Sequence, residues 1–272
     1  MGGTDQLAIV ELGVDAAREG LVLSTEAHWN QNEADWRFFL GQGTVFGVRD
    51  GDRLIATAAL LPYGGGNAWI SMVLVTQTWR RRGLATRLVD ACLERAAGQA
   101  LTPWLDATPA GATVYGPLGF KPVLELRRLR LDGATPAGQS ASNVSIDELI
   151  ARDRHAMGFE RSTLLREFAG RSGSRLVSQD GALALVRDGR TARQIGPLYA
   201  DGMTAAIALV EAIAASETGP LLIDAVGDHH KLLHALTGFG WSIERPFQRM
   251  RFGRAATASA ELPFAVAGPE FG

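Results

Sequence analysis

Three consecutive arginines, Arg80–Arg82, stand directly before Gly83 and a run that is typical of a helix. Like charges repel, and cations at a helix N-terminus face the positive end of the helix dipole. A bound polyanion would offset both costs, because free N–H groups, a glycine and guanidinium groups together suit a phosphate or pyrophosphate. A solvated charge run and a nucleic-acid patch are the alternatives. One triplet in a chain of net charge −2 gives the nucleic-acid patch little support.

The elements that must position this loop are a strand before it, at 68–75, and a helix after it, from Gly83 to about Gln99. The helix would place its apolar residues on one stripe. A hairpin with a turn at Asp50-Gly51-Asp52 precedes the strand. The remaining expected elements are a strand at 7–13, helices at 15–29 and 32–40, a strand at 101–107, a short helical segment at 108–119 and a strand at 120–131.

The same order of elements returns after residue 143. PWLDA (103–107) resembles LLIDA (221–225), and VYGPLGF (114–120) aligns with LHALTGF (233–239). A period this long indicates duplication of a whole domain. We expect a first domain at 1–131, a linker at 132–143 and a second domain at 144–272, with Phe264–Ala267 as a candidate last strand.

Composition narrows the class of protein. The chain has 272 residues, a net charge of −2 and one cysteine, so it forms no internal disulfide and no cysteine-rich metal site. The near-neutral charge argues against nucleic acid as a partner. The start of the chain does not have the pattern of a signal peptide, and the apolar stretches are too short to cross a bilayer. We therefore expect a cytoplasmic protein without membrane or metal partners.

Two motifs carry a resemblance to a known family. Arg80 to Ala85 fits a pattern of Arg or Gln, two residues, Gly, one residue, and Gly or Ala, whereas the dinucleotide and P-loop fingerprints are absent. Tyr115 to Phe120 fits Tyr, three residues, Gly, Phe, one strand and one short helix downstream. The chain thus resembles the GNAT superfamily of acetyl-CoA-dependent N-acetyltransferases, in the tandem two-domain form of YitH-like proteins. The resemblance implies an α+β fold of duplicated domains, each a mostly antiparallel mixed sheet flanked by helices.

The resemblance also implies a set of site residues. Acetyl-CoA would rest its pyrophosphate on the loop and the helix start, and its pantetheine arm on the backbone of the preceding strand. Tyr115 would be the general acid that protonates the leaving sulfur, and a backbone N–H near Leu74 or Val75 would stabilise the oxyanion. The residues implied for acetyl-CoA are Val73, Leu74, Val75, Arg80, Arg81, Arg82, Gly83, Leu84, Ala85 and Thr86.

The general base and the acceptor pocket are less defined. The strand 68–75 carries no carboxylate where many relatives have a Glu. Asp106 is a candidate base, but its counterpart Asp224 in the second repeat favours a structural role such as a helix cap, and a water chain could deprotonate the amine. The joint between the first two helices supplies the expected acceptor contacts. These are Glu26, His28, Trp29 and Asn30, with Thr108 added where many relatives have Asn; Trp29 and Trp36 are also interpreted as packing residues.

The second repeat lacks the chemical groups of the first. Tyr199-Ala200-Asp201-Gly202 stands where the first repeat has Arg80–Gly83, and His234 stands where it has Tyr115. Asp201 would repel a phosphate. We expect this repeat to bind no acetyl-CoA and to have a structural or pocket-forming role. His229, His230 and His234 match no metal motif.

The leading hypothesis is therefore an N-acetyltransferase that passes the acetyl group of acetyl-CoA to a primary amine of a small molecule or peptide, by direct attack in a ternary complex. A non-catalytic acyl-CoA sensor is the alternative, and a purely structural protein is a weaker third. The expected partner is the amine acceptor, and assembly as a homodimer stays open.

Overall fold

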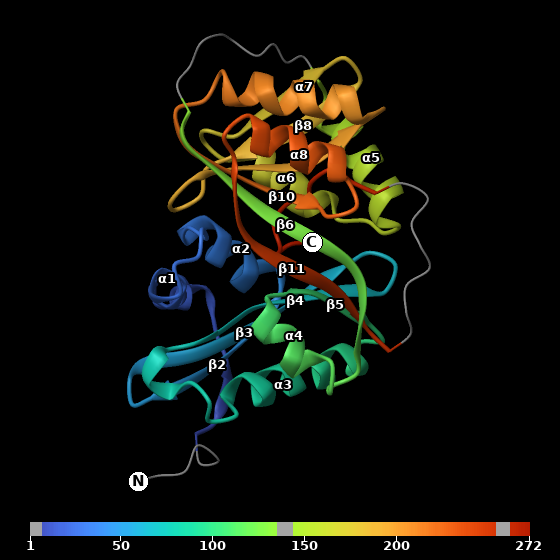
Figure 1. Ribbon diagram of the computed structural model, residues 1–272. Coiled ribbons are helices and arrows are strands. Elements are labelled where there is room, and N and C mark those ends of the chain that lie inside the picture. Colours follow the sequence, from blue (N-terminus) through green and yellow to red (C-terminus); the bar gives the residue numbers. More distant parts are fainter. Residues whose placement is uncertain (1–6, 135–143, 254–261) are drawn as a thin grey trace. The chain divides into compact units, whose positions relative to one another are not determined.

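The computed structural model describes residues 7–134, 144–253 and 262–272, which form two compact units (Figure 1). Unit 1 comprises the described residues up to Leu105 together with Arg251–Gly253, and unit 2 comprises the others. The division does not follow the sequence repeat, because the residues from Asp106 to Ala134 lie in unit 2.

Unit 1 is built on strands in the order β1–β2–β3–β4–β5. Neighbouring strands are antiparallel except β4 and β5, which are parallel. Gly51, with φ of +58°, forms the tight turn between β2 and β3, a conformation that glycine adopts at little cost. The strands are β1 (Ile9–Glu11), β2 (Thr44–Asp50), β3 (Arg53–Tyr63), β4 (Asn67–Val75) and β5 (Thr102–Ala107), whose last two residues belong to unit 2.

Two helices of unit 1 show the local signals that favour a helix. A capping box of Asn32 and Asp35 starts α2, with each side chain accepting a hydrogen bond from the other residue's backbone N–H. The apolar stripe predicted for α3 is confirmed at Leu84, Leu88, Cys92 and Ala96, which are buried, whereas Ala91, predicted on the same stripe, is only partly buried. The helices are η2 (Val14–Ala16), α1 (Ala17–Glu26), α2 (Glu33–Gln42), η3 (Gln77–Trp79) and α3 (Leu84–Gly98).

Unit 2 contains strands in the order β11–β6–β10–β9–β8–β7. Strands β9 and β10 are parallel, and β10–β6, β7–β8 and β8–β9 are antiparallel. The strands are β6 (Phe120–Ala134), β7 (Arg175–Gln179), β8 (Ala182–Arg187), β9 (Arg193–Ala200), β10 (Gly219–Val226) and β11 (Ser242–Phe252). The helices are α4 (Pro109–Tyr115), α5 (Ile146–Met157), α6 (Ser162–Gly170), α7 (Met203–Ala214) and α8 (His230–Gly238).

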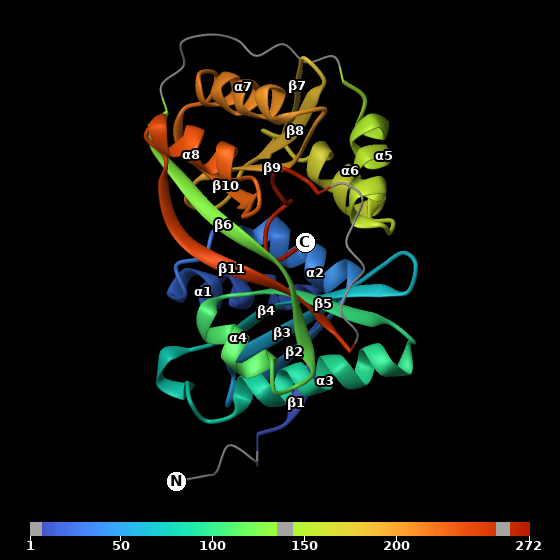
Figure 2. The ribbon, with the colours of Figure 1, turned by 45° about the vertical axis from the view of Figure 1, so that its right-hand side comes forward.

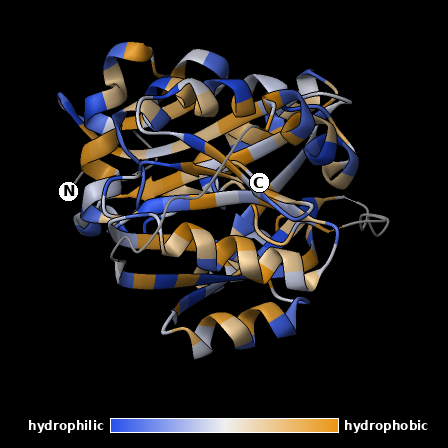
Figure 3. Cartoon of the chain, turned by 90° about the horizontal axis from the view of Figure 1, so that it is seen from above, coloured by the Kyte–Doolittle hydropathy of each residue, from blue (hydrophilic) through white to orange (hydrophobic). Residues whose placement is uncertain are grey.

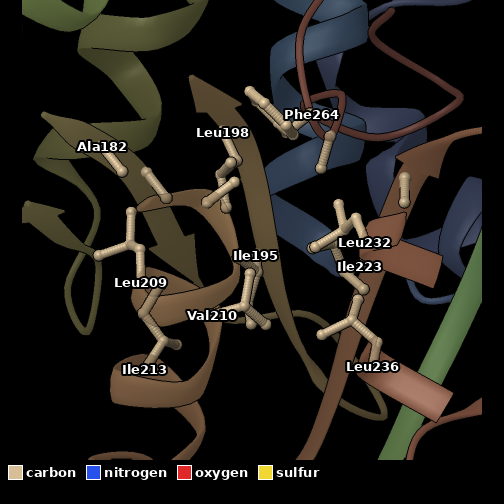
Figure 4. Close-up of a cluster of buried hydrophobic side chains, with 14 of the residues drawn as sticks. Ala182, Ile195, Leu198, Leu209, Val210, Ile213, Ile223, Leu232, Leu236 and Phe264 are labelled. Carbon is tan, nitrogen blue, oxygen red and sulfur yellow. The ribbon is translucent and has the colours of Figure 1, made fainter. Parts of the chain in front are cut away.

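The core of unit 2 lies between the sheet and the helices α7 and α8. Figure 2 shows the pair α7 and α8 on one side of β8 and β9 and the pair α5 and α6 on the other. The helices carry apolar bands beside hydrophilic ones (Figure 3), as expected when one face is buried. Ile195, Leu209, Ile223 and Leu236 are fully buried members of the cluster drawn in Figure 4.

Two expectations from the sequence are changed by the structure. Phe264–Ala267 forms no strand of its own. Ala265 instead makes isolated bridges to Leu198 and to Ala225. The strand β6 continues to Ala134, so the first residues of the expected linker belong to it, and residues 135–143 lie outside the described part of the chain.

Candidate active site

The loop between β4 and α3 leads into a helix start that no side chain caps. Gly83 is the N-cap residue of α3, has φ of +79° and makes no side-chain cap hydrogen bond. A Cβ atom at this position would find no atom within 4 Å. The first N–H groups of α3 are therefore not capped by the N-cap residue, and this geometry suits an anion at the N-terminus of a helix.

Arg80, Arg81 and Arg82 are exposed on this loop. Nε of Arg80 donates to the carbonyl oxygen of Val75 at 3.0 Å. Nη2 of Arg82 donates to that of Thr78 at 3.0 Å, and its guanidinium lies 4.7 Å from the ring centre of Trp79. Within the described residues, none of the three forms an ion pair with a carboxylate, and Arg81 has no hydrogen-bond partner. Backbone oxygens thus orient two of these cations while their charge stays available to an anion.

Glu26 fastens the start of the loop. Its carboxylate accepts a hydrogen bond from the Thr76 hydroxyl at 2.7 Å and another from the backbone N–H of Gln77 at 2.5 Å. The Gln77 hydrogen bond is the largest cause that lowers the pKa of Glu26 below its ordinary value, and Thr76 adds to it. A residue expected from the sequence to touch the acceptor therefore has a structural partner in the loop itself.

Strand β4 offers backbone along one edge. Its parallel ladder with β5 comprises three residue pairs and ends at Trp69–Trp104, while β4 continues to Val75. A register shift against β3 accompanies a φ of +51° at Met72, whose carbonyl oxygen accepts from the Thr57 hydroxyl at 2.8 Å. Such a bulge re-aims the strand. The segment with Val73, Leu74 and Val75 follows this bulge directly.

The expected acceptor residues of unit 1 lie at the end of α1 and just after it. His28 is exposed with φ of +57°, and the backbone N–H of Trp29 donates to Ser24 at 2.9 Å. Asn30 is buried. Trp36 is fully buried and donates from Nε1 to the Ser24 hydroxyl at 2.8 Å, which confirms it as a packing residue.

Tyr115 and Thr108 belong to α4 in unit 2. Tyr115 is the last residue of this helix and is partly exposed, with its ring 6.1 Å from that of Phe120. Thr108 is the N-cap residue of α4, and its hydroxyl accepts from the backbone N–H of Gly111 at 3.2 Å. The helix cap expected at Asp106 is therefore made by Thr108.

Asp106 forms an ion pair inside unit 2. Its two carboxylate oxygens accept from Nε and Nη2 of Arg249 at 2.9 and 2.8 Å, and its side chain is fully buried. Burial raises the pKa of this carboxyl, against the lowering effect of Arg249. A carboxylate with both oxygens bonded to one guanidinium is a structural group, which leaves Asp106 poorly suited to act as the base.

The second repeat has no counterpart of the arginine loop. Only Asp201 and Gly202 separate β9 from α7, so Tyr199 and Ala200, expected to match the arginines, are strand residues. Tyr199 is buried and donates its hydroxyl to Asp153 at 2.6 Å. Asp201 accepts from Arg152 at 2.6 Å. The shorter connection removes the loop itself, a difference that aligning the residue letters did not show.

The described residues contain no group of three or more His, Cys, Asp or Glu side chains placed to hold a metal ion. None of the helices in the same residues is long and apolar enough to span a membrane.

Family models match both repeats. Residues 14–120 match the acetyltransferase (GNAT) family, and residues 149–263 match an acetyltransferase (GNAT) domain. The chain carries two GNAT domains in tandem. The second match is decisive, because it covers the repeat whose motifs are lost.

Similar proteins share this tandem GNAT arrangement or its fold. An uncharacterized N-acetyltransferase, YitH, of Bacillus subtilis is 25% identical over 236 residues, which cover 81% of this chain and 83% of the relative. A putative acetyltransferase from Pyrococcus horikoshii has a TM-score of 0.80 at 19% identity, covering 99% of this chain and 97% of that one. A tandem GNAT protein from the clavulanic acid biosynthesis pathway has a TM-score of 0.65 at 17% identity, covering 93% and 100%. The last two show the fold alone.

Proposed function

We propose that this tandem GNAT protein is an acetyl-CoA-dependent N-acetyltransferase and that its first GNAT domain holds the acetyl-CoA. The observation that carries the proposal is the exposed triplet Arg80–Arg82. Its guanidiniums pair with no carboxylate in the described residues, and it precedes the uncapped N-terminus of α3. Cations and free helix N–H groups together are the chemistry that binds a pyrophosphate.

Each proposed residue has a distinct task. The arginines and the backbone from Gly83 to Thr86 bind the pyrophosphate, and the backbone of Val73–Val75 pairs with the amides of the pantetheine arm. A neutral amine attacks the thioester carbonyl carbon, the carbon–sulfur bond breaks, and the Tyr115 hydroxyl gives its proton to the leaving sulfur. The amine releases its own proton to water, which later restores the tyrosine hydroxyl. The acceptor is a primary amine of a small molecule or peptide, and Glu26, His28, Trp29, Asn30 and Thr108 are its proposed contacts.

The lack of a carboxylate in β4 is consistent with a second function, that of a non-catalytic acyl-CoA sensor. Strand β4 contains no carboxylate in its sequence, NAWISMVLV, so it supplies no general base. A domain that binds acyl-CoA without turnover, as a sensor, would need the arginine loop but not Tyr115. The two functions differ in what the loss of Tyr115 does.

Calorimetric titration of acetyl-CoA into the purified chain tests the binding site. We expect one equivalent per chain and a loss of affinity of about tenfold or more in Arg81→Glu, because charge-assisted contacts to phosphate are lost and reversed. Lys231→Glu, which makes the same charge change in the exposed first turn of α8, is the control and should bind normally. No binding to the unmodified chain would refute the proposal.

Turnover separates the enzyme from the sensor. With a panel of primary amines, Tyr115→Phe should lower kcat by about 100-fold or more while acetyl-CoA still binds, as expected for the loss of a general acid. Binding without turnover in the unmodified chain, over the whole panel, would favour the sensor.

A further inference from the structure

Strands β9 and β10 of unit 2 diverge in the same manner as β4 and β5 of unit 1. Their parallel ladder comprises three residue pairs and ends at Ile195–Ile223. Beyond this point β9 continues to Ala200 and β10 to Val226. Two parallel strands that part in this way expose backbone N–H and C=O groups on facing edges, and buried groups of this kind need partners.

The segment from Phe264 to Val266 supplies those partners. It lies between the two diverging strands and exchanges backbone hydrogen bonds with both, although it is far from them in sequence. With β9, the N–H of Leu198 donates to Ala265 at 2.9 Å and that of Phe264 donates to Leu198 at 2.9 Å. With β10, the N–H of Val226 donates to Phe264 at 3.1 Å and that of Val266 donates to Asp224 at 3.0 Å.

The sequence of β9 leaves room for this segment. A Cβ atom on Gly196 would lie 2.0 Å from the backbone oxygen of Val266, so a side chain there would collide with it. Ala265, Val266 and Ala267 are fully buried. Phe264 belongs to the core cluster with Leu198 (Figure 4). The segment is thus packed as core rather than laid on a surface.

Charged and aromatic side chains hold the segment at both ends. Near its start, the His229 ring stacks on Phe264 at 4.3 Å and its Nε2 lies 3.0 Å from the Pro263 carbonyl oxygen. Farther along, Arg187 donates to Ala267 at 3.1 Å. Buried Arg161 donates to the backbone oxygens of Phe271 and Gly272 and pairs with Asp153.

We propose that the space between the diverging ends of β9 and β10 is a binding site for an extended polypeptide backbone, and that residues 262–272 of the same chain occupy it. In the second repeat, this segment lies between the diverging strands β9 and β10; in the first repeat, the corresponding place between β4 and β5 is where the proposed function puts the arm of acetyl-CoA. This comparison rests on the proposed function, whereas the hydrogen bonds of the segment with β9 and β10 do not depend on it. The second GNAT domain is therefore closed to acetyl-CoA by its own chain, and not only by loss of the arginine loop.

Amide hydrogen exchange on the full chain tests directly whether the segment is hydrogen-bonded between β9 and β10. We expect the amides of Leu198, Val226, Phe264 and Val266 to exchange at least about 100-fold more slowly than in an unstructured peptide, as core strands do. In Gly196→Ala, exchange of all four should accelerate while β7 and β8 stay protected. Gly158→Ala is the matched control, because Gly158 also has a positive φ, of +74°, but a Cβ there meets no atom within 4 Å, so it adds backbone strain without a collision. Unprotected amides in the unmodified chain would overturn the proposal.

A second experiment, on a chain with an inserted protease site, tests the proposal even if Gly196→Ala fails to fold. A protease recognition sequence replaces residues 256–260, and the folded chain is then cut. The released C-terminal peptide, which contains residues 262–272, should stay bound through gel filtration. After mild denaturation, a synthetic LPFAVAGPEFG should rebind at least about tenfold more tightly than the same peptide with Val266→Pro, which lacks a backbone donor. Loss of the peptide on cutting, or its displacement by excess acetyl-CoA, would overturn the proposal. Failure of acetyl-CoA to bind the uncut chain would refute only the proposed function.

Discussion

Asp106 and Arg249 are joined by two hydrogen bonds, of 2.9 and 2.8 Å, although 143 residues separate them. Asp224, the counterpart of Asp106 in the second repeat, is joined in the same way to Arg128, at 2.8 Å for both bonds. Arg128 comes from the last strand of the first repeat, and Arg249 from the last strand of the second. Each repeat's aspartate is thus neutralised by the other repeat's terminal strand, inside unit 2.

Arg249→Met should strongly destabilise the protein. It leaves the fully buried Asp106 without its cation, and breaking a buried pair in this way costs about 3–5 kcal/mol. Urea unfolding measures the change in free energy. Arg166→Met, which breaks the exposed pair with Asp147, is the control and should cost less than about 1 kcal/mol. Equal small losses in both variants would show that the buried pair does not stabilise the fold.

The sequence predicted what is encoded locally. The arginine loop, the helix after it and the hairpin at Gly51 depend on residues close together in the chain, and the structure has them within a few residues. Trp36, interpreted from the sequence as a packing residue, is fully buried.

Long-range partners could not be predicted in this way. Nothing near Asp106 in sequence indicates Arg249, and nothing near Phe264 indicates that it lies between β9 and β10. Nothing near Glu26 in sequence indicates Thr76 and Gln77, 50 and 51 residues away, which donate hydrogen bonds to its carboxylate. The type of a residue indicates that it needs an ionic or apolar partner, but which residue becomes that partner depends on the fold.

Ser24→Ala should destabilise unit 1 through Trp36. The Ser24 hydroxyl accepts the indole N–H at 2.8 Å, and both residues are fully buried. A buried donor left without its acceptor costs about 1–3 kcal/mol, which urea unfolding resolves. Thr25→Ala, at the next and exposed position of α1, is the control and should be neutral or slightly stabilising because alanine favours helices. A neutral Ser24→Ala would mean that another acceptor replaces the hydroxyl.

Glu26→Gln should weaken acetyl-CoA binding by several-fold. The carboxylate holds Thr76 and Gln77 at the start of the arginine loop, so its loss frees the loop that binds the pyrophosphate. Calorimetry measures the change, and Glu94→Gln, on the exposed side of α3, is the control. Unchanged affinity for acetyl-CoA in Glu26→Gln would show that the hydrogen bonds of Glu26 to the loop do not contribute to binding.

The Glu26 anchor should also depend on pH. Its hydrogen bonds lower the folded-state pKa of Glu26 below the ordinary value of 4.5, so its contribution to stability is complete above that value and is lost as the pH falls through the folded pKa. The difference in Tm between the unmodified chain and Glu26→Gln should therefore be constant above about pH 5 and shrink in more acidic buffer. A difference that grew on acidification would contradict this assignment.

Cys92, the one cysteine of the chain, should be inert in the folded protein. It is fully buried in α3, and burial raises the pKa of its thiol to about 12. Almost no reactive thiolate exists near neutral pH, so the thiol should not react with a disulfide reagent until urea unfolds the chain. This bears on the mechanism, because a cysteine that cannot attack a thioester cannot carry the acetyl group. Cys92→Ala should keep full turnover with any accepted amine, and acetyl label trapped on Cys92 would instead require transfer in two steps.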